Sequence, residues 1–351
     1  MIERYTLPEM GAIWSEQAKF QSWLDVEIAA TEANCELGRV PAEAVATIQQ
    51  KASFSVERIL EIEAEVRHDV IAFLTNVNEH VGDAGRYIHV GMTSSDVLDT
   101  GVALQMKASV QLLRQELDKL ANALRELARA HKGTVMIGRS HAIHGEPITF
   151  GFKVAGWLAE VVRNQERLER LERVVSVGQI SGAMGTYANT DPRVEAIACA
   201  KLGLVPDTAS TQVIARDRHA EYVQTLALVG AALERFSTEI RNLQRTDVLE
   251  VHATLLGLER VGDAEFAGVE FSGWMREAAD RPALTAGCQE SGRRSAGGAG
   301  GCSFFGFPTN AATNWPITYS IMGVVTSSSM ISGEMPIASN GSTSRQRTSM
   351  Y

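Results

Sequence analysis

The chain of 351 residues is long enough for two or three domains, and its 45% hydrophobic content is ample for a buried core. A formal net charge of -9 and a pI near 5.5 argue against a general nucleic-acid or anionic-membrane surface, because phosphate groups attract basic patches. The N-terminus lacks a basic segment followed by an apolar one, and no run of roughly 18 apolar residues occurs, so we expect a cytoplasmic protein without a membrane span.

Short helices are predicted for the first part of the chain, over residues 10–38, 41–52 and 56–81. Ser55 precedes the third of these and is expected to cap it, with Glu57 and Arg58 in the first turn. Strand signals are sparse, with short candidates only at residues 134–137 and 179–180.

Three longer helices are predicted from apolar residues spaced three and four apart. Each is expected to be about 20 to 30 residues long, above the average for globular proteins, which favours a bundle. The last of the three is expected to begin near Arg216 and to reach Val248. Leucine-rich seams of this kind also suit packing between subunits, so an oligomer is expected. The stripes are Leu113, Leu117, Leu120, Leu124 and Leu127; Phe152, Leu158, Val161, Leu168, Leu171 and Val175; and Leu226, Val229, Leu233, Phe236, Ile240 and Leu243.

The fold class predicted from these patterns is mainly α. We expect an N-terminal helical domain over residues 1–93, an incomplete central helix bundle over residues 94–250, and an anomalous tail over residues 251–351. The tail contains no lysine, 14 of the 30 glycines and 13 serines, and helical periodicity fades there. Glycine and serine at this density favour turns and flexible chain, so an irregular tail is expected.

Polar clusters lie between the apolar stripes. They are residues 67–69 (Arg-His-Asp), 87–96 (Tyr-Ile-His-Val-Gly-Met-Thr-Ser-Ser-Asp), 138–147 (Gly-Arg-Ser-His-Ala-Ile-His-Gly-Glu-Pro), 181–189 (Ser-Gly-Ala-Met-Gly-Thr-Tyr-Ala-Asn), and 210–212 with 216–219. The first three hold four of the eight histidines, His68, His89, His141 and His144. Histidine titrates near neutrality, so this concentration indicates acid–base or anion-binding chemistry. A structural hydrogen-bonding role remains the alternative for each histidine taken singly.

The sequence also argues against other classes of site. His141 and His144 are three residues apart and would share a helical face, but no HExxH pattern occurs and Pro147 follows closely, so no metal site is predicted. The four cysteines are scattered and show no CxxC pair, which argues against zinc and against a disulfide framework. Residues 182–185 lack the Lys-Ser/Thr ending of a phosphate-binding P-loop, and no GxSxG elbow of a serine hydrolase is present.

Residues 1–250 resemble the bacterial adenylosuccinate lyases, of the fumarase and aspartase superfamily. The resemblance is carried by the opening Met-Ile-Glu-Arg-Tyr, the step at residues 67–70, the loop at residues 89–94 and the loop at residues 181–189. It implies a fold of long bundled helices and a homotetramer with active sites shared between subunits. It also implies a carbon–nitrogen lyase that releases fumarate from adenylosuccinate, leaving AMP, and from the succinyl-carboxamide ribotide of purine synthesis.

Such a β-elimination needs a base that removes a proton next to a carboxylate, donors that hold the resulting charge, and an acid for the departing nitrogen. The resemblance assigns the general acid to His141 and a helper near the succinyl group to His68. It assigns substrate binding to Arg4, Tyr5, Arg67, Asp69, His89, Thr93, Ser94, Ser140 and Gln212. Among these, Arg4, Tyr5 and His89 match positions that hold the nucleotide phosphate. No cofactor is implied, because the substrate carboxylate itself delocalises the carbanion.

The resemblance ends near Val251. After a Leu-Glu-Val step like that at residues 249–251, the family continues with a mobile loop of the form Ser-Ser-x-Met-Pro-x-Lys-x-Asn-Pro, whose serine is the expected base. Nothing in residues 252–351 matches this loop. The tail is either a frameshift or fusion artefact or a genuine divergent segment. The chain is accordingly expected to be an adenylosuccinate lyase front half, with another lyase of the superfamily or an inactive scaffold as alternatives.

Overall fold

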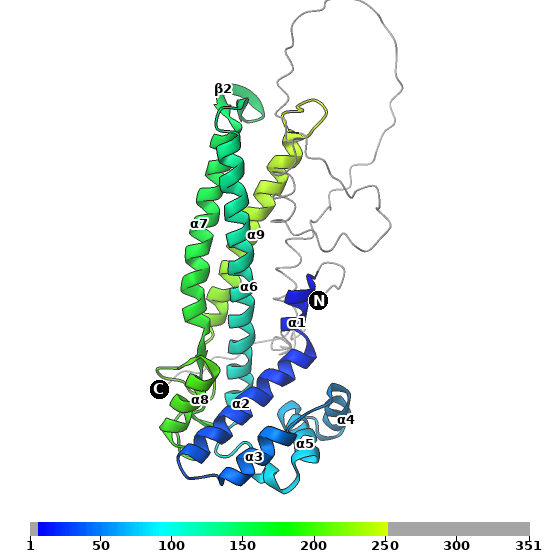
Figure 1. Ribbon diagram of the computed structural model, residues 1–351, viewed down its shortest axis with the longest axis vertical. Coiled ribbons are helices and arrows are strands. Elements are labelled where there is room, and N and C mark those ends of the chain that lie inside the picture. Colours follow the sequence, from blue (N-terminus) through cyan, green and yellow to red (C-terminus); the bar gives the residue numbers. More distant parts are fainter. Residues whose placement is uncertain (1–5, 252–351) are drawn as a thin grey trace, which may run out of the picture.

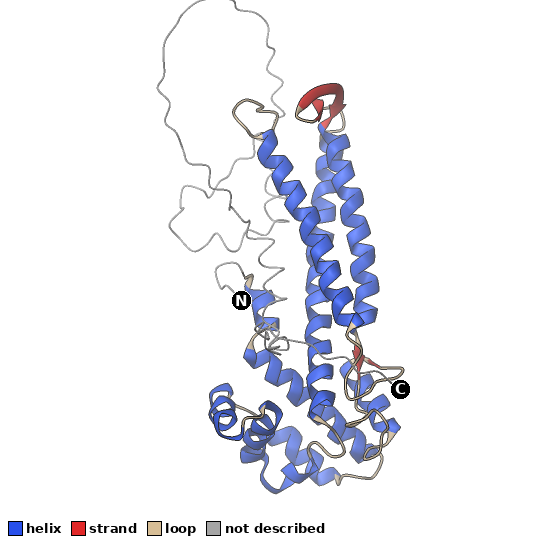
Figure 2. Ribbon diagram, turned by 180° about the vertical axis from the view of Figure 1, so that it is seen from behind, coloured by secondary structure: helices blue, strands red, loops and turns tan. Residues whose placement is uncertain are grey.

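The computed structural model describes residues 6–251, which are mostly helical (Figures 1 and 2). The predicted mainly α class and the long-helix bundle are therefore confirmed. Arg4, Tyr5 and the expected irregular tail lie outside the described residues. No helix within residues 6–251 is both long and apolar enough to cross a membrane.

Five helices form the N-terminal part: α1 (Pro8–Ile13), α2 (Glu16–Glu36), α3 (Ala42–Lys51), α4 (Val56–Val66) and α5 (Asp69–Val81), followed by the short 3-10 helix η2 (Gly82–Tyr87). An aromatic cluster packs α2 against α5. Phe20 lies edge-on to Trp23 with ring centroids 5.0 Å apart, and Phe73 stacks on Phe20 at 5.9 Å. All three side chains are buried, so this cluster is the centre of the N-terminal core.

Two predicted helices are each divided in the structure. The single helix expected over residues 10–38 is wrong, because Ser15 starts α2 as a new helix by accepting the backbone N–H of Ala18. The single helix expected over residues 56–81 is also wrong. Arg67 has φ of 55°, in the left-handed region, and ends α4, and His68 then caps α5 by accepting the N–H of Ile71.

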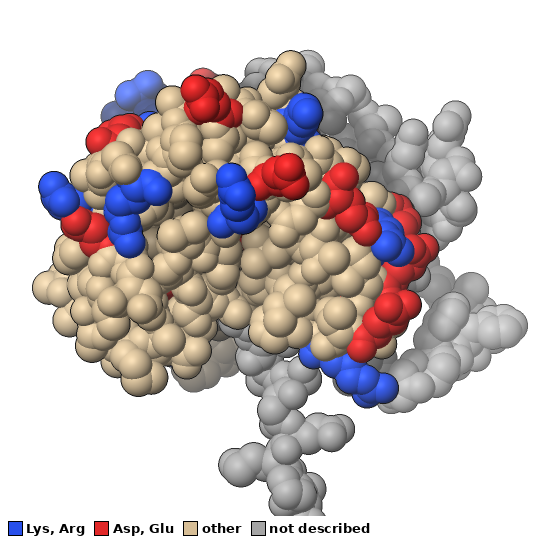
Figure 3. All heavy atoms as spheres, turned by 90° about the horizontal axis from the view of Figure 1, so that it is seen from below, with Lys and Arg blue, Asp and Glu red and all other residues tan. Residues whose placement is uncertain are grey.

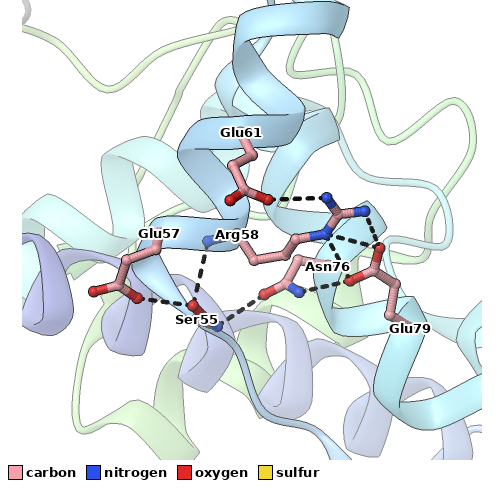
Figure 4. Close-up of polar contacts among 6 residues, drawn as sticks. All are labelled: Ser55, Glu57, Arg58, Glu61, Asn76 and Glu79. Atoms are coloured by element: carbon pink, nitrogen blue, oxygen red, sulfur yellow. Dashed lines mark hydrogen bonds and ion pairs between the residues drawn. The ribbon is translucent and has the colours of Figure 1, made fainter.

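The pair α4 and α5 is held by a polar network at the end of the pair away from Arg67 and His68 (Figure 4). Arg58 donates to Glu79 of α5 at 2.8 Å and to Glu61 at 3.1 Å. The buried Asn76 accepts the N–H of Ser55 and donates to Glu79. Ser55 also accepts the N–H of Arg58, which confirms it as the predicted cap.

Three long helices form the bundle, with α7 (Phe150–Val175) antiparallel to both α6 (Ser94–Ala130) and α9 (Asp217–Leu243) (Figure 1). The stripe predicted on α9 is buried throughout, and Phe236 of α9 stacks on Trp157 of α7 at 5.4 Å. At 37 residues α6 is longer than expected and is the longest helix of the described part. It continues past Gly101, where an added Cβ would meet Trp23 of α2. By contrast α9 is shorter than expected, because it ends at Leu243 rather than at Val248.

The α6–α7 connection is an antiparallel hairpin of β1 (Val135–Ser140) and β2 (Ile143–Thr149). The strand predicted at residues 134–137 is confirmed as the start of β1, whereas β2 was not predicted. His141 and His144 do not share a helical face: His144 pairs with Arg139 across the hairpin, and His141 lies in its turn. The strand predicted at residues 179–180 lies two residues earlier in the structure, as β3 (Val177–Gly178). It pairs in parallel with β4 (Val205–Pro206), and α8 (Pro192–Leu202) lies between the two strands in the sequence.

Candidate active site

The predicted site residues that lie within residues 6–251 fall into two groups at opposite ends of the bundle. Ser140 and His141 lie at the hairpin end, whereas Thr93 and Ser94 lie where α6 begins, at the end that also carries α2 to α5 (Figure 1). Because α6 rises 1.5 Å per residue over 37 residues, the two ends are about 55 Å apart. One chain therefore does not bring its own His141 next to its own Thr93.

The end that carries α2 to α5 is here called the base end, and seen from below it shows acidic and basic side chains interspersed (Figure 3). Among the residues drawn in colour there, no large basic patch covers this face. Binding of a negatively charged substrate at this end would therefore depend on individual donors rather than on a broad positive field.

The turn between α4 and α5 presents Arg67, His68 and Asp69. The Nδ1 atom of His68 accepts the N–H of Ile71 at 3.4 Å and lies 3.4 Å from Asp69 Oδ1. The side chain is 41% exposed, so His68 is accessible to a ligand at the start of α5.

His89 is held by a carboxylate that the sequence analysis did not identify. Glu27 of α2 accepts the His89 backbone N–H at 2.9 Å, and its other oxygen lies 2.5 Å from His89 Nδ1. Burial lowers the pKa of His89, but the hydrogen bond and charge of Glu27, with the charge of Asp96, raise it above its ordinary value. The cationic form of His89 is therefore more favoured than that of an ordinary histidine.

Asp96 joins the start of α6 to the 179–190 loop. Its side chain is fully buried and accepts three backbone N–H groups, from Thr93 at 2.9 Å, Ser181 at 3.2 Å and Gly182 at 3.1 Å. Burial raises the pKa of Asp96 to about 6, against the opposing effect of these donors and of His89. Thr93 is the capping residue of α6, so this carboxylate fixes the start of the helix, where the predicted substrate-binding residues Thr93 and Ser94 lie.

The 179–190 loop is fastened by a second buried carboxylate. Glu195 of α8 accepts the N–H of Ile180 at 2.7 Å and the hydroxyl of Tyr187 at 2.8 Å. Burial raises the pKa of Glu195. Gly91 is required for the close contact with this loop, because it has φ of +77° and an added Cβ would lie 2.3 Å from the carbonyl oxygen of Asn189.

Gln212 lies on the neighbouring 207–216 loop, with its side chain exposed. Its carbonyl oxygen accepts the side chain of Gln179 at 2.6 Å, which ties this loop to the 179–190 loop. Arg216 makes two hydrogen bonds to the buried Asp99 of α6. Gln212, Thr93 and the 179–190 loop are therefore linked to one another through α6.

At the hairpin end, Ser140 and His141 are exposed. His141 and Ala142 form a two-residue turn with φ of 54° and 59°, a conformation that costs ordinary residues free energy. Arg139 forms an ion pair with Glu250, which also accepts the N–H of Ile137 at 3.2 Å. The last described residues therefore pack beside the strand that leads to His141.

One sequence signal for Glu27 was available. It occupies the helical face of α2 that carries Phe20, Trp23 and Leu24, all buried. A charged residue on an apolar stripe is costly unless it has a specific partner, so its position indicates a functional or structural pairing. Nothing local indicates that the partner is 62 residues away. Within residues 6–251, no group of three or more His, Cys, Asp and Glu side chains is placed to hold a metal ion.

Comparison with known proteins gives the family. Residues 3–256 match the family model described as Lyase. The adenylosuccinate lyase of Synechocystis sp. is 70% identical over 251 residues, and that of Bacillus subtilis is 49% identical; each alignment covers 72% of this chain. The chain spans only 58% of the length of these relatives.

Solved structures show the same fold. A fumarate lyase from Mesorhizobium sp. BNC1 superposes with a TM-score of 0.68 at 32% identity, over 71% of this chain and 60% of that one. The 3-carboxy-cis,cis-muconate lactonizing enzyme from Pseudomonas putida gives 0.67, also at 32% identity, over 71% and 59%. The match to the family model covers all of the described residues, and the chain belongs to the lyase family.

Proposed function

We propose that this chain carries the front half of an adenylosuccinate lyase, which eliminates fumarate from adenylosuccinate and from the succinyl-carboxamide ribotide of purine synthesis. The main support is the 70% identity to the Synechocystis enzyme over 251 residues, which is far above the 32% identity to the solved structures with other names. The reaction needs no cofactor, and its substrate is a small nucleotide.

The roles proposed within the site come from the family resemblance, and the geometry supports them. His141 protonates the departing nitrogen, and its exposure in the hairpin turn leaves it free to reach a substrate. His68 and His89 offer N–H donors, and Thr93 and Ser94 lie at the start of a 37-residue helix, where the helix dipole favours a carboxylate. Arg67, Asp69, Ser140 and Gln212 complete the binding residues, with Arg4 and Tyr5 from outside the described part.

The proposal requires more than one subunit, and the observation that carries this is the separation of about 55 Å along α6. His141 of one chain would complete a site with Thr93 and His89 of another. Two apolar side chains of α9 outside its buried stripe support assembly, since Val223 and Leu228 remain 38% and 50% exposed. We propose a homotetramer with shared active sites.

We further propose that the chain as written has little or no lyase activity. Elimination needs a positioned base and positive charge at the developing dianion. In the family both come from the loop after the Leu-Glu-Val step, and the residues after Val251 do not match it. Glu250 contacts Ile137 and Arg139, so the expected loop would start beside the His141 hairpin. An inactive scaffold is therefore the second candidate for this chain itself.

Turnover measurements test the assignment. A version completed with the family's C-terminal half after Val251 should release fumarate from adenylosuccinate but not from argininosuccinate. In it His141→Ala should lower kcat by about two to four orders of magnitude, the usual contribution of a general acid, with a much smaller change in KM. His80→Ala, an exposed histidine of α5, is the matched control and should stay near the parent. A His141→Ala enzyme within a few-fold of the parent would refute the assigned role.

A further inference from the structure

Glu27 is a charged residue in a buried, apolar environment. Its side chain is 1% exposed on the apolar face of α2, and a buried carboxylate is costly unless it is paired and hydrogen-bonded. Both of its oxygens bond to one residue, His89, through the backbone N–H and the ring Nδ1. These two hydrogen bonds offset the free-energy cost of burying Glu27, and they fix the main chain and the ring of His89 together.

The pairing determines which ring nitrogen carries a proton. An ionised carboxylate only accepts hydrogen bonds, so Nδ1 of His89 must donate to Glu27. The other nitrogen, Nε2, has no hydrogen-bond partner within residues 6–251, and the His89 side chain keeps 23% of its surface exposed. The left-handed backbone at His89, with φ of 64°, is retained because the same carboxylate holds its N–H.

The charge of the ring follows from its neighbours. The charged groups that act on His89 are Glu27 from α2 and Asp96 from α6, and both raise its pKa against the opposing effect of burial. A neutral ring with Nδ1 protonated would present a lone pair at Nε2 and repel an anion. A cationic ring instead presents Nε2–H as a charged donor, which forms a stronger hydrogen bond to an anionic oxygen.

We propose that Glu27 is a positioning residue that holds His89 as a cation with Nδ1–H directed at α2 and Nε2–H presented to an anionic oxygen of the substrate. The substrate-facing part of this inference rests on the proposed function, whereas the tautomer and charge of His89 are properties of this chain alone. Glu27→Gln should reverse the arrangement. A glutamine that accepts the His89 backbone N–H through its oxygen turns its NH2 group toward Nδ1, which must then be an unprotonated acceptor.

Nuclear magnetic resonance of the full chain labelled with 15N-histidine tests the proposal, with the His89 signals assigned by their loss in His89→Gln. In the parent chain, His89 should titrate above the ordinary histidine value and stay protonated at Nδ1 once neutral. In Glu27→Gln it should titrate below the ordinary value, and the neutral ring should carry its proton on Nε2. Glu32→Gln is the matched control, because Glu32 lies on the same helix but bonds Lys201 and Gln49, and it should leave His89 unchanged.

The parent spectrum decides the matter even if Glu27→Gln fails to fold, which circular dichroism would reveal. A His89 that is neutral at pH 6.5 with its proton on Nε2 would overturn the proposal, as would an unchanged His89 titration in a folded Glu27→Gln chain. Because no turnover is measured, failure here is separate from failure of the lyase assignment, which the fumarate assay tests.

Discussion

At the scale of single residues, the base end is organised by buried carboxylates that accept main-chain N–H groups. Glu27, Asp96 and Glu195 are each at most 3% exposed, and they hold the 87–93 loop and the 179–190 loop. A carboxylate offers two oxygens and no donor, so it satisfies several N–H groups that would otherwise be left unpaired in the interior. Loop positions at this end are therefore fixed by side chains from helices.

Asp96→Ala tests this at the position with the most such bonds. Removing the carboxylate leaves the N–H groups of Thr93, Ser181 and Gly182 without an acceptor in a buried site. Each unsatisfied group costs about 1 to 3 kcal/mol, so the free energy of unfolding should fall by about 3 kcal/mol or more. Urea denaturation gives this value. Glu126→Ala, at an exposed position of the same helix, should change it by less than about 0.5 kcal/mol, and equal effects would refute the account.

At the scale of elements, side-chain caps decide where several helices begin. The connection between α6 and α7 is made by a turn with a strained backbone. Ser15 and His68 interrupt apolar patterns that would otherwise continue, because each accepts an N–H of the helix that follows. The hairpin turn at His141 and Ala142 requires positive φ at both residues, for which Asn-Gly is the preferred pair. The turn that presents the proposed general acid therefore has a strained backbone, which lowers the stability of the folded chain.

Ala142→Gly measures the free energy stored in this turn. Glycine populates the left-handed region without the penalty from Cβ, so the variant should be more stable by up to about 1 kcal/mol. Ala46→Gly, at an exposed position inside α3, is the matched control and should lose about 1 kcal/mol, since glycine lowers helix propensity. Opposite signs in thermal or urea unfolding support the strained turn, whereas a loss of stability at Ala142 would show that it is relaxed.

These elements also show which structural features can be predicted from the sequence and which cannot. The stripe from Leu226 to Leu243 is buried as predicted, because helical periodicity indicates which face meets a core. Phe152, predicted in the stripe of α7, is instead 71% exposed at the first turn of that helix. The β2 strand was missed because its burial pattern is almost entirely exposed, so no alternation of apolar and polar residues marks it. The pairing of Glu27 with His89 is a contact between distant segments that no local pattern encodes, although the charged position on an apolar stripe was visible. The proposed roles of His68 and His141 stay predictions.

At the scale of the whole molecule, the long bundle separates two sets of chemically useful residues by about 55 Å. The bundle carries its hairpin at one end and its loops at the other, so a single site that uses both sets would need a second chain alongside. Leu228 of α9, which is 50% exposed outside the buried stripe, is one apolar position suited to such packing.

Leu228→Glu tests assembly through α9. A buried carboxylate at a subunit contact would be unpaired, so the variant should sediment as a smaller species than the parent at micromolar concentration. Leu60→Glu is the matched control, because Leu60 is 52% exposed on α4, outside the bundle, and it should leave the assembly unchanged. A parent chain that is already monomeric, or a Leu228→Glu chain that assembles like the parent, would contradict assembly through this face.

Complementation tests the central claim that His141 and the base-end residues act in sites shared between chains. This chain would be co-refolded with a full-length adenylosuccinate lyase that carries the alanine substitution at the position equivalent to His141. We expect each protein alone to release almost no fumarate, and the mixture to recover activity, because some sites would combine His141 of this chain with the loop of its partner. The same mixture made with His141→Ala in this chain should stay inactive. If mixed oligomers form and still release no fumarate, the shared-site account is wrong.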